Sequence, residues 1–394
     1  MMAGGSATAQ AQPRLAIFCD FSYRLDEGTL TAELPFALFL RALAPYFAKV
    51  IVAGRLDVSA PRFPYEMPGV ELAPLPYYRS GAHLAAVLRS LPRAMGRFWR
   101  LLDETDVVWV LGPNPPQAIA FALLGLLRRR RVVLGVRQQL PELVRHRHPG
   151  RPAVWWSASA LDRCFRLLAR VTDVVAVGRP LRRSYEKGRA VHELVVSLVE
   201  EQDLLPADND QRRYDGPELR MLSVGRADPE KNPLLLLEIL RDAVEHDQRW
   251  RLDICGDGLV LDELSQRAGE MGLSDRVTLH GHVAFGSELW AHYRAAHALV
   301  HVSMTEGAPQ VLIEAFAARL PVVATAVGAV EDVLHGRGLL VQPRDAAGTA
   351  GALQRMIDDA HLRAGCVDAG AAYAAAHTRE IEVAKLAQFL DGQA

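Results

Sequence analysis

Residues 219–233 read LRMLSVGRADPEKNP and begin with a short apolar run that ends before Gly225. A run of this length is typical of a buried strand, and the Gly and Pro residues after it indicate a turn into a helix. Asn232 is expected to cap that helix, and Pro233 to be its first residue, where proline is favoured. The stretch therefore predicts one strand–turn–helix unit of an α/β fold.

Short apolar runs alternate with longer helical patterns along the whole chain, as in βα units with parallel sheets. In the second half, strands are expected at 219–224, 251–255, 277–280, 298–302, 321–324 and 338–341, with helices such as 233–244 and 259–271. In the first half, strands are expected at 14–19, 50–53, 70–75, 107–111, 132–136, 174–177 and 194–197, with helices such as 33–47, 83–102 and 153–169. The two series predict two doubly wound, Rossmann-like α/β domains that face each other across a cleft, with ligands at the carboxyl ends of the strands.

Composition divides the chain at residues 201–218, which are polar, contain Pro and Gly and lack periodicity. We expect a linker there, between an N-terminal domain over 14–200 and a C-terminal domain over 219–378. Residues 1–13 are small and polar and are expected to form a disordered leader. Residues 379–394 are expected to form a final helix that packs back on the N-terminal domain.

The 394-residue chain has the composition of a soluble globular protein, with 50% apolar and 23% charged residues. Its four cysteines, Cys19, Cys164, Cys255 and Cys366, are widely separated and form no CxxC pair. They predict neither a disulfide framework nor a zinc site, and they favour a reducing cytoplasm. The longest clean apolar run, 118–127, is too short to span a bilayer.

Charge is distributed unevenly between the two halves of the chain. Residues 1–200 contain 27 basic and 16 acidic residues, a net charge of +11, and the remaining 18 basic and 30 acidic residues give −12. The basic half predicts an anionic ligand or peripheral contact with an anionic membrane face. The stretch 83–102 mixes four arginines with Leu, Phe and Trp, which fits an interfacial amphipathic helix or, as we favour, a core helix with solvated arginines.

Arg226 and Lys231 are the first candidate binding residues. Arg226 follows the end of an expected strand and Lys231 directly precedes an expected helix, so both are expected at one edge of the sheet. Arginine offers a planar fork of donors, lysine a compact charge, and a helix N-terminus favours anions. The pair predicts a diphosphate site, and the alternative is two solvated surface residues.

Residues 304–319 (MTEGAPQVLIEAFAAR) follow another apolar run and contain two glutamates. Gly307 and Pro309 indicate a turn that opens a helix, which puts Glu306 in the loop and Glu314 inside the helix. The neighbours of Glu314 are nearly all apolar, and burying a carboxylate there is costly unless it has a partner. We expect Glu314 either to bind the hydroxyls of a ribose or to interact with the helix dipole or a core salt-bridge partner.

Two glycine-containing loops complete the candidate site. Gly256 and Gly258 (CGDG, 255–258) follow an expected strand and permit either the close approach of a ligand or a tight turn. The stretch 280–289 (HGHVAFGSEL), which includes Val283, follows the next strand. Its backbone amides are expected to contact a nucleobase.

In this order, GRADPEKN (225–232), CGDG, LHGHV (279–283) and EGAPQVLIEAFAARLPVVAT (306–325) resemble the C-terminal domain of retaining glycosyltransferases of family 4. The resemblance covers about residues 219–345, and its hallmark is a pair of glutamates separated by seven residues, matched by Glu306 and Glu314. It implies the GT-B fold and transfer of a hexose-type sugar from a nucleotide-sugar donor with retained anomeric configuration.

The resemblance also implies the roles of individual residues. Arg226 and Lys231 are implied to hold the donor diphosphate and Glu314 the ribose. Glu306 is implied to contact sugar hydroxyls near the reacting carbon. No cofactor and no essential metal are implied, and the one DxD-like string, 208–210, lies in the expected linker. The expected donor site comprises Arg226, Lys231, Gly256, Gly258, Val283, Glu306, Gly307, Ala308, Pro309, Gln310 and Glu314.

The N-terminal half departs from the family pattern. Where members often have a Gly-rich loop after the first strand, residues 20–34 contain only Gly28. Arg137 stands where many members have a histidine near the donor sugar, and we expect it to take an electrostatic role in catalysis. His146 and His148 are weaker candidates for contact with the acceptor, a small molecule, glycan or lipid-linked sugar. Surface histidines are the alternative.

Other functions are compatible with this fold. They include a sugar-nucleotide epimerase, a phosphorylase using pyridoxal phosphate, and a degenerate subunit that binds a partner protein. The set of Arg226, Lys231, Glu306 and Glu314 argues against the degenerate subunit. A nicotinamide-dependent oxidoreductase is disfavoured because no GxGxxG follows the first strand. Nucleic-acid binding is disfavoured because the arginine run at 128–131 lacks an aromatic platform.

Overall fold

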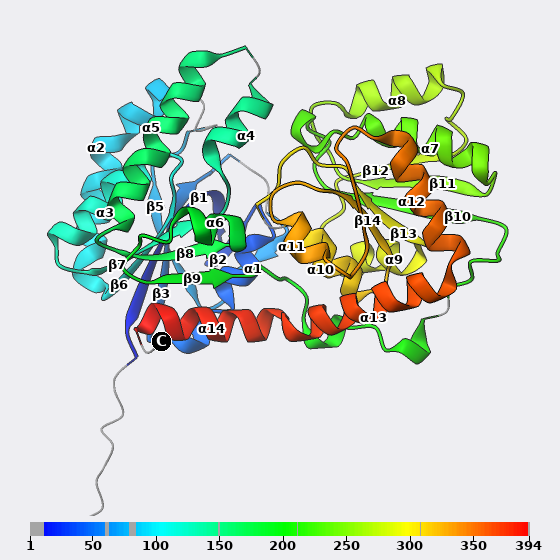
Figure 1. Ribbon diagram of the computed structural model, residues 1–394. Coiled ribbons are helices and arrows are strands. Elements are labelled where there is room, and N and C mark those ends of the chain that lie inside the picture. The colour runs from blue at the N-terminus through cyan, green and yellow to red at the C-terminus, as the bar shows by residue number, and fades with distance from the viewer. Residues whose placement is uncertain are drawn as a thin grey trace, which may run out of the picture.

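The computed structural model describes residues 12–59, 63–78, 84–148, 150–210, 212–307 and 309–392. Two α/β domains lie side by side, each built around its own sheet (Figure 1). The helices α13 (Ala360–Ala376) and α14 (Arg379–Asp391) run along the bottom of this view, from the C-terminal domain back to the N-terminal one. The predicted fold class, two Rossmann-like doubly wound domains across a cleft, is confirmed.

The N-terminal domain contains a sheet of nine strands within the described residues. Its parallel part runs in the order β5-β3-β1-β6-β7-β8-β9. The strands are β1 (Arg14–Asp26), β2 (Thr29–Ala32), β3 (Lys49–Leu56), β4 (Tyr65–Glu66), β5 (Val70–Leu75), β6 (Val107–Gly112), β7 (Arg131–Val136), β8 (Asp173–Val177) and β9 (Val191–Leu194). The helices are α1 (Phe36–Arg41), α2 (Leu84–Leu101), α3 (Gln117–Leu127), α4 (Leu140–Arg147), α5 (Pro152–Ala169) and α6 (Arg179–Ser184). Strands such as β6 are apolar without alternation because both of their faces are buried.

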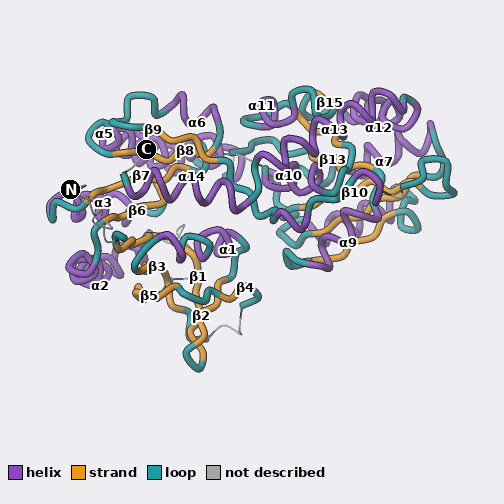
Figure 2. The backbone as a smooth tube through the Cα atoms, turned by 90° about the horizontal axis from the view of Figure 1, so that it is seen from below, coloured by secondary structure: helices purple, strands orange, loops and turns teal. Residues whose placement is uncertain are grey.

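The first strand is longer than the sequence predicts. It was expected to end at Cys19, but β1 continues to Asp26 and turns back as β2, which pairs with it in an antiparallel hairpin. The segment compared above with a Gly-rich loop is therefore mainly strand. Gly28 lies in the hairpin turn with φ +84°, a left-handed conformation that suits glycine. Figure 2 shows this hairpin protruding from the domain.

The C-terminal domain has an all-parallel sheet in the order β12-β11-β10-β13-β14-β15. Its strands are β10 (Leu219–Val224), β11 (Trp250–Cys255), β12 (Val277–Gly281), β13 (Ala298–His301), β14 (Val322–Thr325) and β15 (Leu339–Val341). Its helices are α7 (Leu235–His246), α8 (Leu261–Glu270), α9 (Ser287–Ala295), α10 (Gln310–Ala317), α11 (Val330–Leu334), α12 (Ala346–Asp358) and α13. The strand order reverses between β10 and β13, and doubly wound sheets bind ligands at such a point.

The chain between the two sheets differs from the prediction in one respect. The strand expected at 194–197 ends at Leu194, where β9 ends. The apolar residues beyond it are buried by passing between the domains, since Leu198 belongs to the N-terminal core and Val199 to the C-terminal core. Short 3-10 turns at Glu201–Asp203 and Ala207–Asn209 follow in the expected linker.

The turn after β10 corrects the expected helix start. Asn232 does not cap a helix, and Pro233 is not its first residue. Pro229–Lys231 form a 3-10 turn that ends at Asn232 with φ 54°, and α7 begins only at Leu235. Asparagine tolerates this left-handed conformation better than most residues do. Lys231 therefore lies in a tight turn rather than just before a helix N-terminus.

Two further helices, α14 and α2, pack against the N-terminal core. Helix α14 packs its apolar face into the N-terminal core through Val383, Leu386 and Leu390. Helix α2 runs through Pro92 and buries one face in the same core, while its arginines are exposed, as in the alternative that we favoured. Among the described residues, no helix is both long and apolar enough to cross a membrane.

Candidate active site

A pocket of about 270 Å³ lies between the two domains. The C-terminal domain contributes residues that follow β10 and β13 and the start of α10, and the N-terminal domain contributes residues at the ends of β7 and β8. The pocket thus lies at the reversal point of the C-terminal sheet, where ligands are expected. Its lining residues are Arg137, Gln138, Val177, Val196, Val224, Gly225, Arg226, Lys231, His301, Glu306, Gly307, Pro309, Gln310 and Val311.

Lys231 and Glu306 form an ion pair in this pocket. The Glu306 side chain is only 7% exposed, and His301 Nε2 lies 3.0 Å from the same carboxylate oxygen, Oε1. Burial raises the pKa of Glu306, but the charge of Lys231 and the neighbouring His301 outweigh burial and hold this pKa well below its usual range. The pocket therefore contains an ionised carboxylate beside an ammonium group, which can bind hydroxyl groups and an anion respectively.

Arg226 belongs to a network that joins the two domains. Its guanidinium pairs with Asp228 and lies 2.9 Å from Glu230 Oε1. Arg147, at the end of α4 in the N-terminal domain, contacts the same two carboxylates, with its Nη2 atom 2.5 Å from Glu230 Oε1. Burial raises the pKa of Glu230, but backbone hydrogen bonds and the two arginines lower it below its usual value. Arg226 lines the pocket while two carboxylates hold its guanidinium in place.

Arg137 enters the pocket from the N-terminal domain, directly after β7. Its guanidinium stacks over the Phe36 ring, 3.9 Å from the ring centroid. Burial lowers the pKa of Arg137, but an arginine stays protonated at neutral pH. No carboxylate pairs with it among the residues that the structure describes, so its charge is available to a ligand.

The loop that carries Glu306 touches the N-terminal domain through its backbone. A Cβ atom at Gly307 would lie 2.1 Å from the backbone oxygen of Arg137, and one at Gly328 would lie 2.1 Å from the backbone oxygen of Glu306. Neither position has room for a side chain. The two glycines thus allow the close approach that places Glu306 and Arg137 in one pocket.

Glu314 lies in α10, one turn beyond Gln310, and does not line the pocket. It is buried, and its Oε2 accepts a hydrogen bond of 2.6 Å from the Tyr293 hydroxyl. Burial raises the pKa of Glu314 to about 7, against a lowering effect of the Tyr293 hydrogen bond. Within the described part of the chain, the Tyr293 hydrogen bond reaches only Oε2 of this carboxylate.

The glycine loops pack against neighbouring backbone. A Cβ atom at Gly256 would lie 1.7 Å from the Gly225 oxygen, and one at Gly258 would lie 2.6 Å from the Ala227 oxygen. These two glycines therefore allow the loops after β10 and β11 to meet, and neither lines the pocket. Val283 is half-buried against the C-terminal core and is also outside the lining.

Of the weaker acceptor-side candidates, Gly28 and His148 do not line the pocket. Gly28 is exposed in the turn of the β1–β2 hairpin, and His148 is half-buried just after α4. His146 lies on α4, but its side chain is outside the described part of the structure, as is Ala308 altogether.

Three lining or bridging residues were missed by the sequence analysis. His301 is the one polar residue in the apolar run ALVHV, and a buried polar side chain in a strand was the available signal. Gln138 follows Arg137 and had no distinguishing pattern. Arg147 pairs with Glu230 across 83 positions of sequence, a contact that no local pattern predicts.

The sequence of this chain was compared with family models and with curated proteins. Residues 207–372 match the family model described as glycosyl transferases group 1. Over 154 residues the chain is 38% identical to a D-inositol 3-phosphate glycosyltransferase of Frankia alni, a match that covers 36% of this chain and 38% of that protein. Curated relatives at 30% identity or more are matched over only 14–38% of their own lengths. The family match covers less than half of the chain and lies mainly in the C-terminal domain.

Two further likenesses extend over nearly the whole chain. A GDP-mannose-dependent alpha-(1-6)-phosphatidylinositol monomannoside mannosyltransferase of Mycolicibacterium smegmatis is 26% identical over 375 residues, covering 89% of this chain and 94% of that protein. The solved structure of sucrose-phosphate synthase from Thermosynechococcus elongatus superposes with a TM-score of 0.74 at 19% identity, covering 97% of this chain and 99% of that one. The fold is that of GT-B glycosyltransferases.

Proposed function

We propose that this chain is a glycosyltransferase that moves a hexose-type sugar from a nucleoside diphosphate sugar to an acceptor bound by the N-terminal domain. The observation that carries the proposal is the pocket in which Lys231, Glu306 and Arg226 of one domain meet Arg137 of the other. The group 1 family match over residues 207–372 supports the same activity. The identity of the donor, the nature of the acceptor and the retained anomeric configuration are likewise proposed.

The diphosphate of the donor would bind between Arg226 and Lys231. As the bond from sugar to phosphate breaks, the leaving diphosphate gains negative charge, and fixed cations stabilise it without reorganisation. Lys231 exchanges its Glu306 partner for phosphate oxygens, whereas Arg226 stays oriented by Asp228 and Glu230. The two side chains stabilise the leaving diphosphate without an essential metal or cofactor. Added Mg²⁺ or Mn²⁺ is therefore expected to leave turnover unchanged.

Glu306 would accept hydrogen bonds from the hydroxyls of the transferred sugar. Its ionised carboxylate also stabilises the positive charge that the sugar ring acquires as the leaving group departs. Arg137 would contact the sugar or the phosphate from the opposite wall. Glu314 would bind the ribose with the carboxylate oxygen that Tyr293 leaves unused. We propose transfer with retained configuration, as for the family 4 enzymes that this sequence resembles.

The acceptor is proposed to be anionic. Residues 1–200 carry a net charge of +11, which favours a phosphorylated or lipid-linked acceptor. The names of two relatives, which refer to inositol 3-phosphate and to a phosphatidylinositol mannoside, support acceptors of this kind. Sedimentation with anionic and neutral vesicles at low salt distinguishes an acceptor on an anionic membrane face from a free phosphorylated acceptor.

Calorimetric titration with UDP, GDP, ADP and their hexose conjugates tests the proposal. One nucleotide is expected to bind at a single site, and its sugar conjugate is expected to be consumed only when an acceptor is present. Conversion of the conjugate without an acceptor would instead indicate an epimerase. Absence of binding by all of these nucleotides would overturn the proposal in favour of a protein-binding subunit. The anomeric configuration of the product, read by NMR, tests retention.

A further inference from the structure

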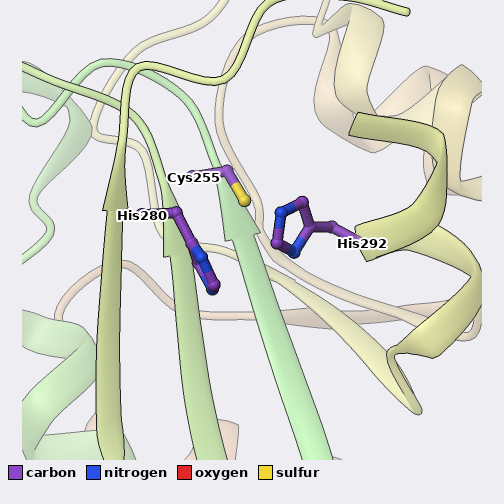
Figure 3. Close-up of side chains that lie close together, drawn as sticks. All are labelled: Cys255, His280 and His292. Atoms are coloured by element: carbon purple, nitrogen blue, oxygen red, sulfur yellow. The ribbon is translucent and has the colours of Figure 1, made fainter. Parts of the chain in front are cut away.

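Cys255, His280 and His292 form a cluster away from the pocket, within the C-terminal domain. One thiol sulfur and one ring nitrogen from each histidine all lie within 4.8 Å of one another. Cys255 is at the end of β11, His280 in the neighbouring strand β12, and His292 on α9 (Figure 3). Topology brings them together: β11 pairs with β12 in parallel, and α9 packs its His292 toward the same place.

The donor atoms have the chemistry of a transition-metal site. Zinc binds thiolate sulfur at about 2.3 Å and imidazole nitrogen at about 2.0–2.1 Å, so tetrahedral ligand atoms are separated by about 3.3–3.8 Å. The present donor atoms lie within 4.8 Å of one another, so they must move closer together to bind one ion. One thiolate with two imidazoles selects Zn²⁺ or Co²⁺ over Mg²⁺ and Ca²⁺, which prefer oxygen ligands.

A carboxylate orients one of the proposed ligands. His280 Nε2 lies 2.8 Å from Asp253 Oδ1, and Asp253 is buried. This bond fixes the ring and leaves Nδ1 as the free nitrogen, an arrangement typical of histidines that bind metal. Asp253 also receives Arg220 Nη1 at 3.3 Å, which holds the carboxylate in position.

The charges around the cluster favour a cation. The charged groups that act on Cys255 are the carboxylates of Asp253 and Glu288, and the same two carboxylates act on His292. The His280 and His292 rings are tilted by 59° with their centroids 4.3 Å apart, so two positive charges there would repel each other. Two imidazoles and a thiol beside two carboxylates are suited to a divalent ion. Cys255 is buried whereas both histidines are half-buried, so an ion has access from the histidine side.

We propose that Cys255, His280 and His292 bind one Zn²⁺-type ion, with water or another small ligand in the fourth position. On binding, the Cys255 thiol transfers its proton to solvent and its sulfur forms the metal bond, and no redox change occurs. The ion would connect β11, β12 and α9, and so hold the loops 256–258 and 281–286. The site is separate from the pocket and stands whether or not the protein transfers sugar.

Competition for Zn²⁺ against a chromophoric chelator, on the full-length chain freed of metal, tests the site. One ion per chain is expected. Cys255→Ser and His292→Gln are each expected to weaken binding at least about a hundredfold, and Asp253→Asn about ten- to a hundredfold. Cys366→Ser is the matched control, because Cys366 is also a buried cysteine but lies outside the cluster. It is expected to bind Zn²⁺ like the unsubstituted chain.

Cobalt substitution gives an independent reading of the ligand set. Co²⁺ is expected to show a thiolate-to-metal charge-transfer band in the near ultraviolet, which is lost in Cys255→Ser and kept in Cys366→Ser. Circular dichroism of each metal-free variant shows that the fold is intact, and His292→Gln, at a half-buried position, keeps the test open should Cys255→Ser unfold. Unchanged Zn²⁺ affinity in both cluster variants, or no charge-transfer band, would overturn the proposal and leave adventitious binding by surface histidines.

Discussion

Replacing Lys231 with methionine tests the donor site most directly. Methionine keeps an unbranched side chain but removes the charge that pairs with Glu306 and, in the proposed complex, with the diphosphate. A charged hydrogen bond contributes about 1.5–3 kcal/mol. Its loss is therefore expected to weaken binding of the nucleoside diphosphate about ten- to a hundredfold.

The same substitution has a separate effect on stability. Breaking a buried ion pair costs about 3–5 kcal/mol, but the Lys231 side chain is 24% exposed, so we expect a loss of about 1–2 kcal/mol in the free energy of unfolding. The loss arises because Glu306, 7% exposed, keeps its charge without a lysine partner. Adding Glu306→Gln should therefore restore most of the stability but none of the nucleotide affinity.

Calorimetric titration with the bound nucleotide and unfolding by urea measure the two effects separately. Lys187→Met is the matched control, since Lys187 is exposed and far along the chain from the pocket residues. It should leave both quantities unchanged. An affinity within about twofold of the unsubstituted chain in Lys231→Met would remove Lys231 from the donor site. A stability loss that Glu306→Gln does not restore would refute the account of the ion pair.

Three further predictions concern groups around the pocket. Burial raises the pKa of Glu314 from 4.5 to about 7 in the folded state, which therefore holds this proton more tightly than the unfolded chain does. The free energy of unfolding should consequently fall by about 3 kcal/mol as the pH rises from about 4.5 to 7. Urea unfolding measured across this pH range should show little or no such fall in Glu314→Gln. An equal fall in that variant would show that Glu314 is not the group responsible. Gly307→Ala should destabilise the close contact between the domains by about 1–3 kcal/mol, because the added Cβ would clash with the Arg137 backbone oxygen. Turnover should fall about five- to a hundredfold. Gly351→Ala is the control and should leave turnover unchanged, because a Cβ there meets nothing within 4 Å. Arg147→Gln should weaken the inter-domain ion pair with Glu230 by about 1 kcal/mol or less, since the Arg147 side chain is 36% exposed. Solution X-ray scattering should then show a larger radius of gyration. An unchanged radius would show that this ion pair does not hold the domains together.

Local pattern determined the elements of this protein well. The strands at 70–75 and 219–224 were predicted with the observed bounds, because each is a short, mainly apolar run between Pro- or Gly-containing turns. Predictions were wrong where the backbone conformation was unusual or burial had another cause. Asn232 took a left-handed conformation instead of capping a helix, and the apolar residues after Leu194 are buried between domains rather than in a sheet.

The sequence by itself determined the two-domain α/β architecture and singled out Arg226, Lys231 and Glu306, because periodicity and residues at strand ends are local properties. Only the tertiary structure decided which charges meet. The pairing of Arg147 with Glu230 and the cluster of Cys255 with two histidines join segments far apart in sequence. Such contacts depend on strand order and domain approach, and electrostatic partners act through space rather than along the chain, so no local pattern encodes them.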